Sequence, residues 1–551
     1  MNKNTWMPTA DLLIRNAKIY TVDLSIADIK SGKTDFTVIA NGFVAAKDGK
    51  TIAVGDVPDE RLIGEDTEIL DAGGAVLLPG LIDSHMHAMF AGIELLRVNF
   101  KDCRSKEALL ALLKQRADAM PDGEWILGCE WNELVWDKKE APTKSDLDRA
   151  APNNPVMCCR LCHHVYAVNS RALALAGITR DTPDPDGGSI GRSGDGEPNG
   201  LLYENAAMGL IDAVIPEMTE EETVRAIEGI GKVMNGFGIT ACIDANMTFE
   251  QMRAYPQARA QGRLTYRGNM MFYLDKAWGD VGYHLRRIRE MTAVTGFGDD
   301  MVKMNGIKVT LDGIPATGTA AMREPYRHMP ETSGCTTITE EEMLEVARLG
   351  AKYNWQIGVH CCGDRATDVA IKAFAEAYRI NPNDARHYII HCAVYREDQL
   401  PLLREHNIPI TVQPTIALQM GEQPLIGEEL ERRYQQLKVF CDAGVLVGGS
   451  SDCPVVSCNP FLGMYAAVTR LGADGKLYSP DQALTKEQCI ILWTKASAYF
   501  CHDDDRSGSI APGNFADYAL IDTDILAASP EEIRDTRVLK TVLGGKLVYE
   551  L

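Results

Sequence analysis

Two histidines, His85 and His87, stand one residue apart at the end of a run that reads as a β-strand. Side chains two positions apart on a strand point to the same face, so both imidazoles could reach one metal ion. Taken alone, the pair fits a polar strand end equally well. The chemistry therefore depends on what the other strand ends contribute.

Other side chains of metal-binding types also lie in or directly after strand-like runs. His360 closes one run, His391 closes another, and Asp452 follows a third. Lys308 lies inside an apolar run, where an unpaired ammonium group is costly to bury. If these strand ends meet, their side chains can hold one or two divalent metals. The predicted metal site consists of His85, His87, Lys308, His360, His391 and Asp452.

The elements that must position these residues alternate between apolar strand-like runs and amphipathic helices. Helical spacing of apolar residues is clear at 340–353 and 367–378. One strand-like run leads into His85, and seven more lie at residues 239–244, 266–273, 306–311, 356–360, 387–391, 408–413 and 445–449. Eight strands with helices between them fit a (β/α)8 barrel, whose C-terminal strand ends share one mouth. We therefore predict an α/β protein built on a TIM-type barrel.

Two further parts complete the predicted domain organisation. Both ends of the chain read as short strands separated by turns, so we predict one small β-sandwich from residues 1–80 and 506–551. The catalytic barrel would occupy residues 81–505. About 150 residues separate its first two strands, far more than a crossover helix needs. Residues 98–205 are therefore predicted to form an inserted α+β subdomain, a lid over the barrel mouth.

Composition narrows the class of protein. The 551 residues include 56 lysines and arginines against 77 aspartates and glutamates, a net charge of −21 that disfavours nucleic acids and membranes as partners. A hydrophobic fraction of 45% excludes a disordered scaffold. The N-terminal residues lack the apolar core of a signal peptide, and no apolar run reaches the ~18 residues of a membrane span. We predict a cytoplasmic protein with reduced cysteines that acts on a small molecule.

The run at 78–87, Leu-Pro-Gly-Leu-Ile-Asp-Ser-His-Met-His, ends in the His85 and His87 pair. Further distinctive motifs lie at residues 168–173, 307–308, 311–313, 359–360, 363–365, 390–391, 412–414, 449–455 and 464–470. The first run is similar to the opening strand of the amidohydrolase superfamily, and the other motifs resemble those of the YtcJ-like branch of the family-3 amidohydrolases. The resemblance covers nearly the whole chain.

This resemblance implies a barrel with a split β-sandwich, a homodimer, and a centre of one or two divalent metals, usually zinc. Carried over position by position, the four histidines above are metal ligands. Lys308 would be a metal-bridging ligand carboxylated by CO2, and Asp452 would be the catalytic acid and base beside the metal. His164 aligns with a histidine that often precedes an Asn-Ser motif, and is predicted to hydrogen-bond the developing oxyanion.

The chain departs from the branch around the substrate pocket. Cys162 and Ile390 stand where the branch often has aspartate and glutamate, and Cys361-Cys362 replaces small apolar residues. Asp364 and Arg365 follow His360 and are predicted to bind substrate, with a loop-fixing ion pair as the alternative.

The predicted reaction is hydrolysis of a non-peptide C–N bond in a small amide, an N-acyl or N-formyl amine, or a cyclic amide. A metal-activated hydroxide would attack the carbon, and Asp452 would move the proton. Two alternatives stay open, because a fold does not fix its chemistry. One is decarboxylation or hydration in the same barrel, and the other is a metal-bound binding protein without catalysis.

Overall fold

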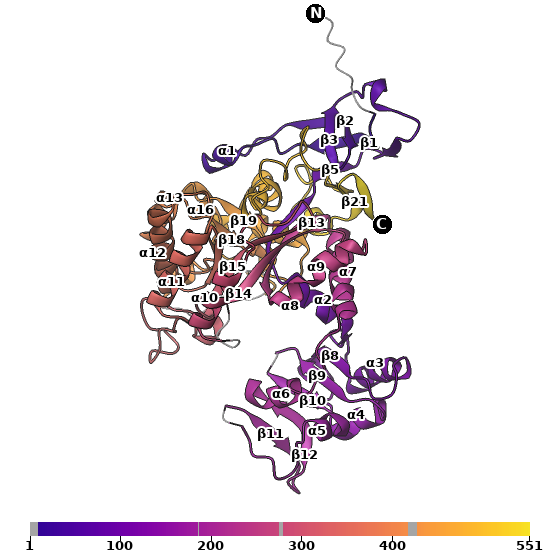
Figure 1. Cartoon of the computed structure of the whole chain (residues 1–551), viewed down its shortest axis with the longest axis vertical. Helices are drawn as coiled ribbons and strands as arrows, with labels where there is room; N and C mark the ends of the chain where they lie inside the picture. Colours follow the sequence, from indigo (N-terminus) through magenta and orange to yellow (C-terminus); the bar gives the residue numbers. More distant parts are fainter. Residues whose placement is uncertain (1–8, 163, 186, 275–278, 417–426) are drawn as a thin grey trace, which may run out of the picture. The chain divides into compact units, whose positions relative to one another are not determined.

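The computed structural model describes residues 9–162, 164–185, 187–274, 279–416 and 427–551 (Figure 1). The chain divides into two compact units, Met1–Phe90 with Ile230–Leu551, and Ala91–Gly229. The predicted insertion, residues 98–205, falls inside the second unit. Two helices run across the unit boundaries, α2 (Ala88–Leu96) and α7 (Glu220–Gly236).

The first unit contains eight parallel strands that form a nearly closed barrel. In spatial order they are β6 (Leu81–Met86), β13 (Ile239–Met247), β14 (Arg267–Leu274), β15 (Val302–Thr310), β16 (Gln356–Cys361), β17 (Tyr388–His391), β18 (Ile410–Val412) and β19 (Val447–Gly449). Beyond β19, the amide of Asp452 donates to the carbonyl of His85 at 2.9 Å, and the amide of His87 donates to that of Cys453 at 2.8 Å. These bonds join the segment after β19 to the end of β6. The predicted eight-stranded barrel is confirmed.

Helices lie beside these strands (Figure 1). After α7 they are α8 (Phe249–Met252), α9 (Ala254–Ala260), α10 (Val281–Glu290), α11 (Glu340–Tyr353), α12 (Asp364–Ile380), α13 (Gln399–Glu405), α15 (Glu428–Glu431), α16 (Lys438–Asp442), α17 (Pro460–Thr469), α18 (Lys486–Ile491) and α19 (Ser497–Phe500). The predicted helix at 340–353 matches α11, because Thr339 and Glu342 form a capping box and Asn354 ends the helix at φ 57°.

Strands from both ends of the chain pair in one eight-stranded sheet. The N-terminal members are β1 (Leu12–Tyr20), β2 (Val38–Lys47), β3 (Lys50–Gly55), β4 (Glu68–Asp71) and β5 (Val76–Pro79), with α1 (Ile26–Lys30) between β1 and β2. The C-terminal members are β20 (Tyr518–Ile521), β21 (Val538–Leu543) and β22 (Lys546–Glu550), with α20 (Pro530–Arg534) between β20 and β21. Antiparallel pairing of β20 with β5 joins the two ends, and Leu77, Leu520 and Val542 share one apolar cluster.

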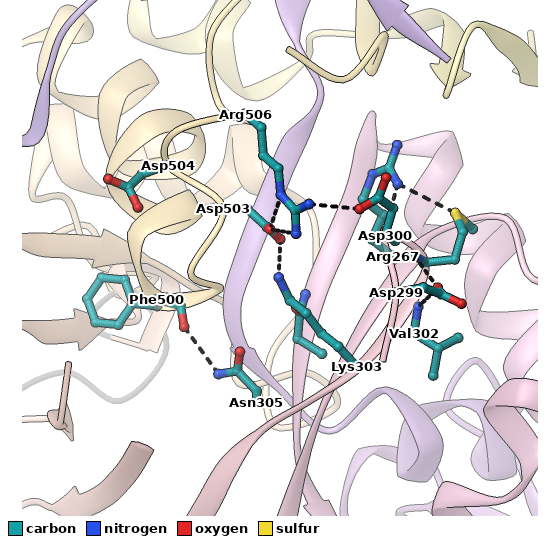
Figure 2. A network of polar contacts seen from close by, with 12 residues as sticks. Arg267, Asp299, Asp300, Val302, Lys303, Asn305, Phe500, Asp503, Asp504 and Arg506 are labelled. Carbon is teal, nitrogen blue, oxygen red and sulfur yellow. Dashed lines mark hydrogen bonds and ion pairs between the residues drawn. The ribbon is translucent and has the colours of Figure 1, made fainter. Parts of the chain in front are cut away.

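A network of ion pairs lies at the N-terminal ends of the barrel strands (Figure 2). Lys303, on β15, contacts Asp503 at 2.6 Å, and Arg506 contacts both Asp503 and Asp300 at 2.8 Å. At the start of β14, the guanidinium of Arg267 makes two hydrogen bonds, of 2.7 and 2.9 Å, to the carboxylate of Asp517, the residue before β20. Arg267 and Asp517 are both buried. These contacts fix the terminal sheet to the barrel end where such folds carry stability rather than catalysis.

The second unit is built on a six-stranded sheet in the order β11-β12-β10-β9-β8-β7. Its strands are β7 (Val98–Asn99), β8 (Ile126–Trp131), β9 (Val156–Arg160), β10 (Val165–Val168), β11 (Ser189–Arg192) and β12 (Pro198–Tyr203). Its helices are α3 (Lys106–Asp118), α4 (Lys144–Ala150), α5 (Ser170–Leu175) and α6 (Glu204–Asp212). Among the described residues, no helix has the length and apolarity needed to cross a bilayer.

Candidate metal centre

The six residues predicted to bind metal line one cavity of about 360 Å³. They reach it from five barrel strands: His85 and His87 at the end of β6, Lys308 on β15, His360 on β16, His391 at the end of β17, and Asp452 three residues after β19. Parallel strands of a barrel end at one mouth, which is why residues up to 367 positions apart converge there.

The carboxylate of Asp452 is at the centre of this group. Its Oδ1 lies 3.1 Å from Nε2 of His85 and 3.0 Å from Nε2 of His87. One ligand atom each from His85, His391 and Asp452 lie within 4.8 Å of one another. The ring of His360 stacks edge-on against that of His391, with centroids 4.4 Å apart.

Two residues of the centre have left-handed backbone conformations. His391 has φ 75° and Asp452 has φ 61°, and Cys392, after His391, has φ 46°. Non-glycine residues adopt such conformations at a cost of order 1–3 kcal/mol, and they cluster at functional sites. Here the strained backbone turns the side chains of His391 and Asp452 into the cavity.

The protonation states of these groups suit metal binding. Burial, reinforced by the charge of Lys308, lowers the pKa of His85 to about 3 and that of His360 to about 4. Burial holds the pKa of His391 well below its usual value. Burial alone would raise the pKa of Asp452, but its close contacts with the imidazoles of His85 and His87 outweigh burial and hold that pKa low. At neutral pH these three imidazoles are neutral and the carboxylate is ionised, which are the forms that bind zinc.

Lys308 is buried, and its Nζ lies 3.5 Å from Nε2 of His85. Burial lowers the pKa of this amine to about 8. Among the described residues it forms no salt bridge, and the charge of Asp452 offsets the cost of its burial only in part.

Three buried polar residues hold the centre from outside the cavity. Asp83 accepts hydrogen bonds from the backbone amides of His85 and Ser451, at 3.2 and 3.1 Å. Oε1 of Gln413 lies 2.6 Å from Nδ1 of His391. Asp312 accepts hydrogen bonds from three backbone amides, including that of Cys362 at 2.9 Å. These bonds fix the loop after His360. Such outer contacts orient metal ligands.

The remaining predicted site residues lie elsewhere. Asp364 and Arg365 do not line the cavity. Asp364 is fully buried and accepts a hydrogen bond from Nε of Arg396 at 2.6 Å, and Arg365 donates to the carbonyl of Gly334 at 2.9 Å. These contacts fit the loop-fixing alternative, and substrate binding by the pair stays a prediction.

His164 belongs to the second unit. Its Nδ1 lies 2.8 Å from Oε2 of Glu204, and its side chain is 61% exposed. Its predicted contact with the oxyanion stays a prediction.

Several residues that line the cavity or support it were not predicted from the sequence. Asn246 follows the predicted strand at 239–244 by two residues, and it lines the cavity with Tyr273. Gln413 ends another predicted strand. Asn246 and Gln413 stand at strand ends, and this position was the sequence feature that could have indicated them. It was not sufficient, because neutral amides at strand ends often serve only to stabilise the fold.

Known proteins share the sequence pattern and the fold of this chain. A model of the amidohydrolase family matches residues 68–549. YtcJ of Bacillus subtilis (strain 168) is 29% identical over 504 residues, covering 89% of this chain and 92% of that protein. N-substituted formamide deformylase of Arthrobacter pascens is 26% identical over 557 residues, covering 98% of both.

Among solved structures, an uncharacterized metal-dependent hydrolase from Pyrococcus horikoshii OT3 has the same fold. It superposes with a TM-score of 0.76 at 24% identity, covering 94% of this chain and 99% of that one. Because the family model spans most of the sequence, the chain belongs to the amidohydrolase family.

Proposed function

We propose that this protein is a metal-dependent hydrolase that cleaves a non-peptide C–N bond in a small, uncharged amide. The observation that carries the proposal is the convergence of His85, His391 and Asp452 in a closed cluster inside the barrel mouth. A deformylase of N-substituted formamides among the relatives supports the choice of bond.

The donor set fits a divalent metal, zinc above all. Neutral buried imidazoles with an ionised carboxylate are typical zinc ligands. The four histidines and Asp452 would hold one ion or two, with Lys308 as the bridging ligand. When bound, the metal lowers the pKa of water toward ~7 and polarises the substrate carbonyl.

Lys308 would serve as a ligand only after carboxylation. Its amine nitrogen would attack the carbon of CO2 and lose a proton, which leaves an N-linked carboxylate. This change replaces a buried cation that has no salt bridge among the described residues with an anion that can bind cations. The absence of such a pairing supports the modification.

Asp452 would carry the proton through the reaction. Its Oδ1 is an ionised acceptor in the centre of the cluster, within 3.1 Å of two imidazoles. It would take the proton from the attacking water and give it to the departing nitrogen, so that the amine leaves neutral.

The cavity wall supports an uncharged substrate. Ile314, Pro315, Ile416 and Val455 contribute apolar surface. Among the described lining residues, Lys308 is the only lysine or arginine, so a substrate carboxylate would find no dedicated cation.

A panel of amides tests the proposal. Zinc-loaded protein should hydrolyse at least one N-acyl amine, N-formyl amine or cyclic amide, lose that activity with a chelator, and regain it when zinc is restored. Turnover that resists complete metal removal, or a metal-loaded protein inactive on the whole panel, would contradict the proposal. In the second case decarboxylation, hydration and pure binding become the readings to test.

A further inference from the structure

Asn246 presents an unused hydrogen-bond acceptor to the cavity. It lies near the C-terminal end of β13, two residues beyond Asp244, which pairs with Met86 at the end of β6. It therefore stands at the level of the metal centre, and it lines the same cavity as His87. Its Oδ1 is buried and has no hydrogen-bond partner among the described residues.

Two neighbouring polar groups, those of Tyr273 and Lys308, are already engaged. The hydroxyl of Tyr273 is paired with Oγ1 of Thr310 at 3.1 Å, and Lys308 lies against His85. A buried acceptor without a donor is unfavourable, and native structures keep few of them. The orphaned oxygen of Asn246 is explained if a ligand supplies the donor.

We propose that Asn246 accepts a hydrogen bond from the N–H of a secondary amide substrate. This inference rests on the proposed function, and it names the substrate class more closely. A carbonyl oxygen needs a donor or a metal and cannot pair with Oδ1, whereas the amide N–H can. The N-substituent would then lie along the apolar wall formed by Ile314, Pro315 and Val455.

A hydrogen bond to Asn246 makes the site selective for substrates that carry an N–H group. A compound of similar shape that lacks the N–H leaves the oxygen of Asn246 unpaired and forces it against an ester oxygen or an N-methyl group. A site built to bind an N–H therefore rejects analogues without it.

The probes are N-butylformamide, its ester analogue butyl formate, and N-butyl-N-methylformamide, each with zinc-loaded protein. We expect wild type to prefer the secondary amide over the tertiary amide by at least about 10-fold in kcat/KM. Asn246→Ala should lower kcat/KM for N-butylformamide by about 10- to 100-fold and change the values for the other two compounds by less than about threefold. Thr310→Val, at a hydroxyl already paired with Tyr273, should preserve the wild-type preference.

The outcomes separate the two proposals. An equal loss on all three compounds in Asn246→Ala, with zinc content and Tm unchanged, would overturn the role of Asn246 as an N–H acceptor. Equal turnover of the secondary and the tertiary amide by wild type would also overturn this role. That measurement uses wild type alone, so it does not depend on whether a variant folds. Zinc-loaded wild type that hydrolyses no amide would overturn the proposed function and, with it, this inference.

Discussion

The contact between Gln413 and His391 can be tested by removing its acceptor. Oε1 of Gln413 lies 2.6 Å from Nδ1 of His391, while its Nε2 donates to Oγ of Ser450 at 2.8 Å. The second bond fixes the orientation of the amide, so Nδ1 of His391 carries a proton and donates it. In that tautomer Nε2 of His391 is free to bind a metal. Gln413→Leu keeps the size of the side chain and removes both bonds.

The expected loss follows from the burial of both groups. Gln413 is 0% exposed and His391 is 5% exposed, so water cannot replace the lost acceptor. A buried donor left unpaired costs about 1–3 kcal/mol. Since 1.4 kcal/mol is about tenfold in an equilibrium constant, zinc affinity should fall by about 10- to 100-fold, the range known for such outer contacts.

The assay is a zinc titration in competition with a chromophoric chelator, beside urea unfolding of the metal-free protein. Gln356→Leu is the matched control, because Gln356 is also 0% exposed and bonded, through Nε2 to the carbonyl of Arg386 at 2.9 Å. It lies at the opposite end of a barrel strand, and should lower stability without weakening zinc binding. Wild-type affinity in Gln413→Leu, or an equal loss in Gln356→Leu, would refute the reasoning.

Three further predictions concern the chemistry and the fold. Asp452→Asn should fold normally and lose about 10²- to 10⁴-fold in kcat, measured on the best amide of the panel; loss of less than tenfold would remove Asp452 as the proton carrier. Burial lowers the pKa of His387 to about 3. Below pH ~6.5 the unfolded chain therefore binds a proton at His387 that the folded chain does not, and the free energy of unfolding falls as the pH is lowered from about 6.5 to about 3. His387→Asn keeps an acceptor for the amide of Ile357 and should make urea midpoints fall less steeply in this window; an unchanged slope would contradict the assignment. Asp517→Ala should destabilise the protein by about 3–5 kcal/mol by leaving Arg267 buried and unpaired, and a urea midpoint equal to that of wild type would show the pair to be dispensable.

The barrel could be predicted because its signals are local. Helical spacing of apolar residues predicted a helix over residues 340–353, and α11 has these bounds. The convergence of the candidate metal ligands in one cavity could also be predicted, because histidines at the ends of apolar runs are unusual, and a buried lysine such as Lys308 more so.

Other features depend on contacts that no local pattern encodes. The insertion was expected at residues 98–205, whereas the second unit is Ala91–Gly229. Helix α2 runs across one boundary and α7 across the other, so each boundary falls inside a continuous helix. A helical sequence pattern therefore does not mark the residue at which one unit ends and the other begins. Asn246 and Gln413 are neutral amides, and only their surroundings in the folded chain distinguish an orphaned acceptor from one that orients a ligand.

Metal content decides whether the barrel mouth holds the proposed catalytic metal centre with Lys308 as a bridging ligand. The decisive measurement is elemental analysis of metal per chain, for wild type beside Lys308→Ala. We expect about two divalent ions in wild type and a clear loss in the variant, accompanied by loss of amide hydrolysis. One ion that is unchanged by the substitution would make Lys308 a structural or substrate-binding residue. A wild-type protein without metal, even after reconstitution with zinc, would contradict the proposed centre.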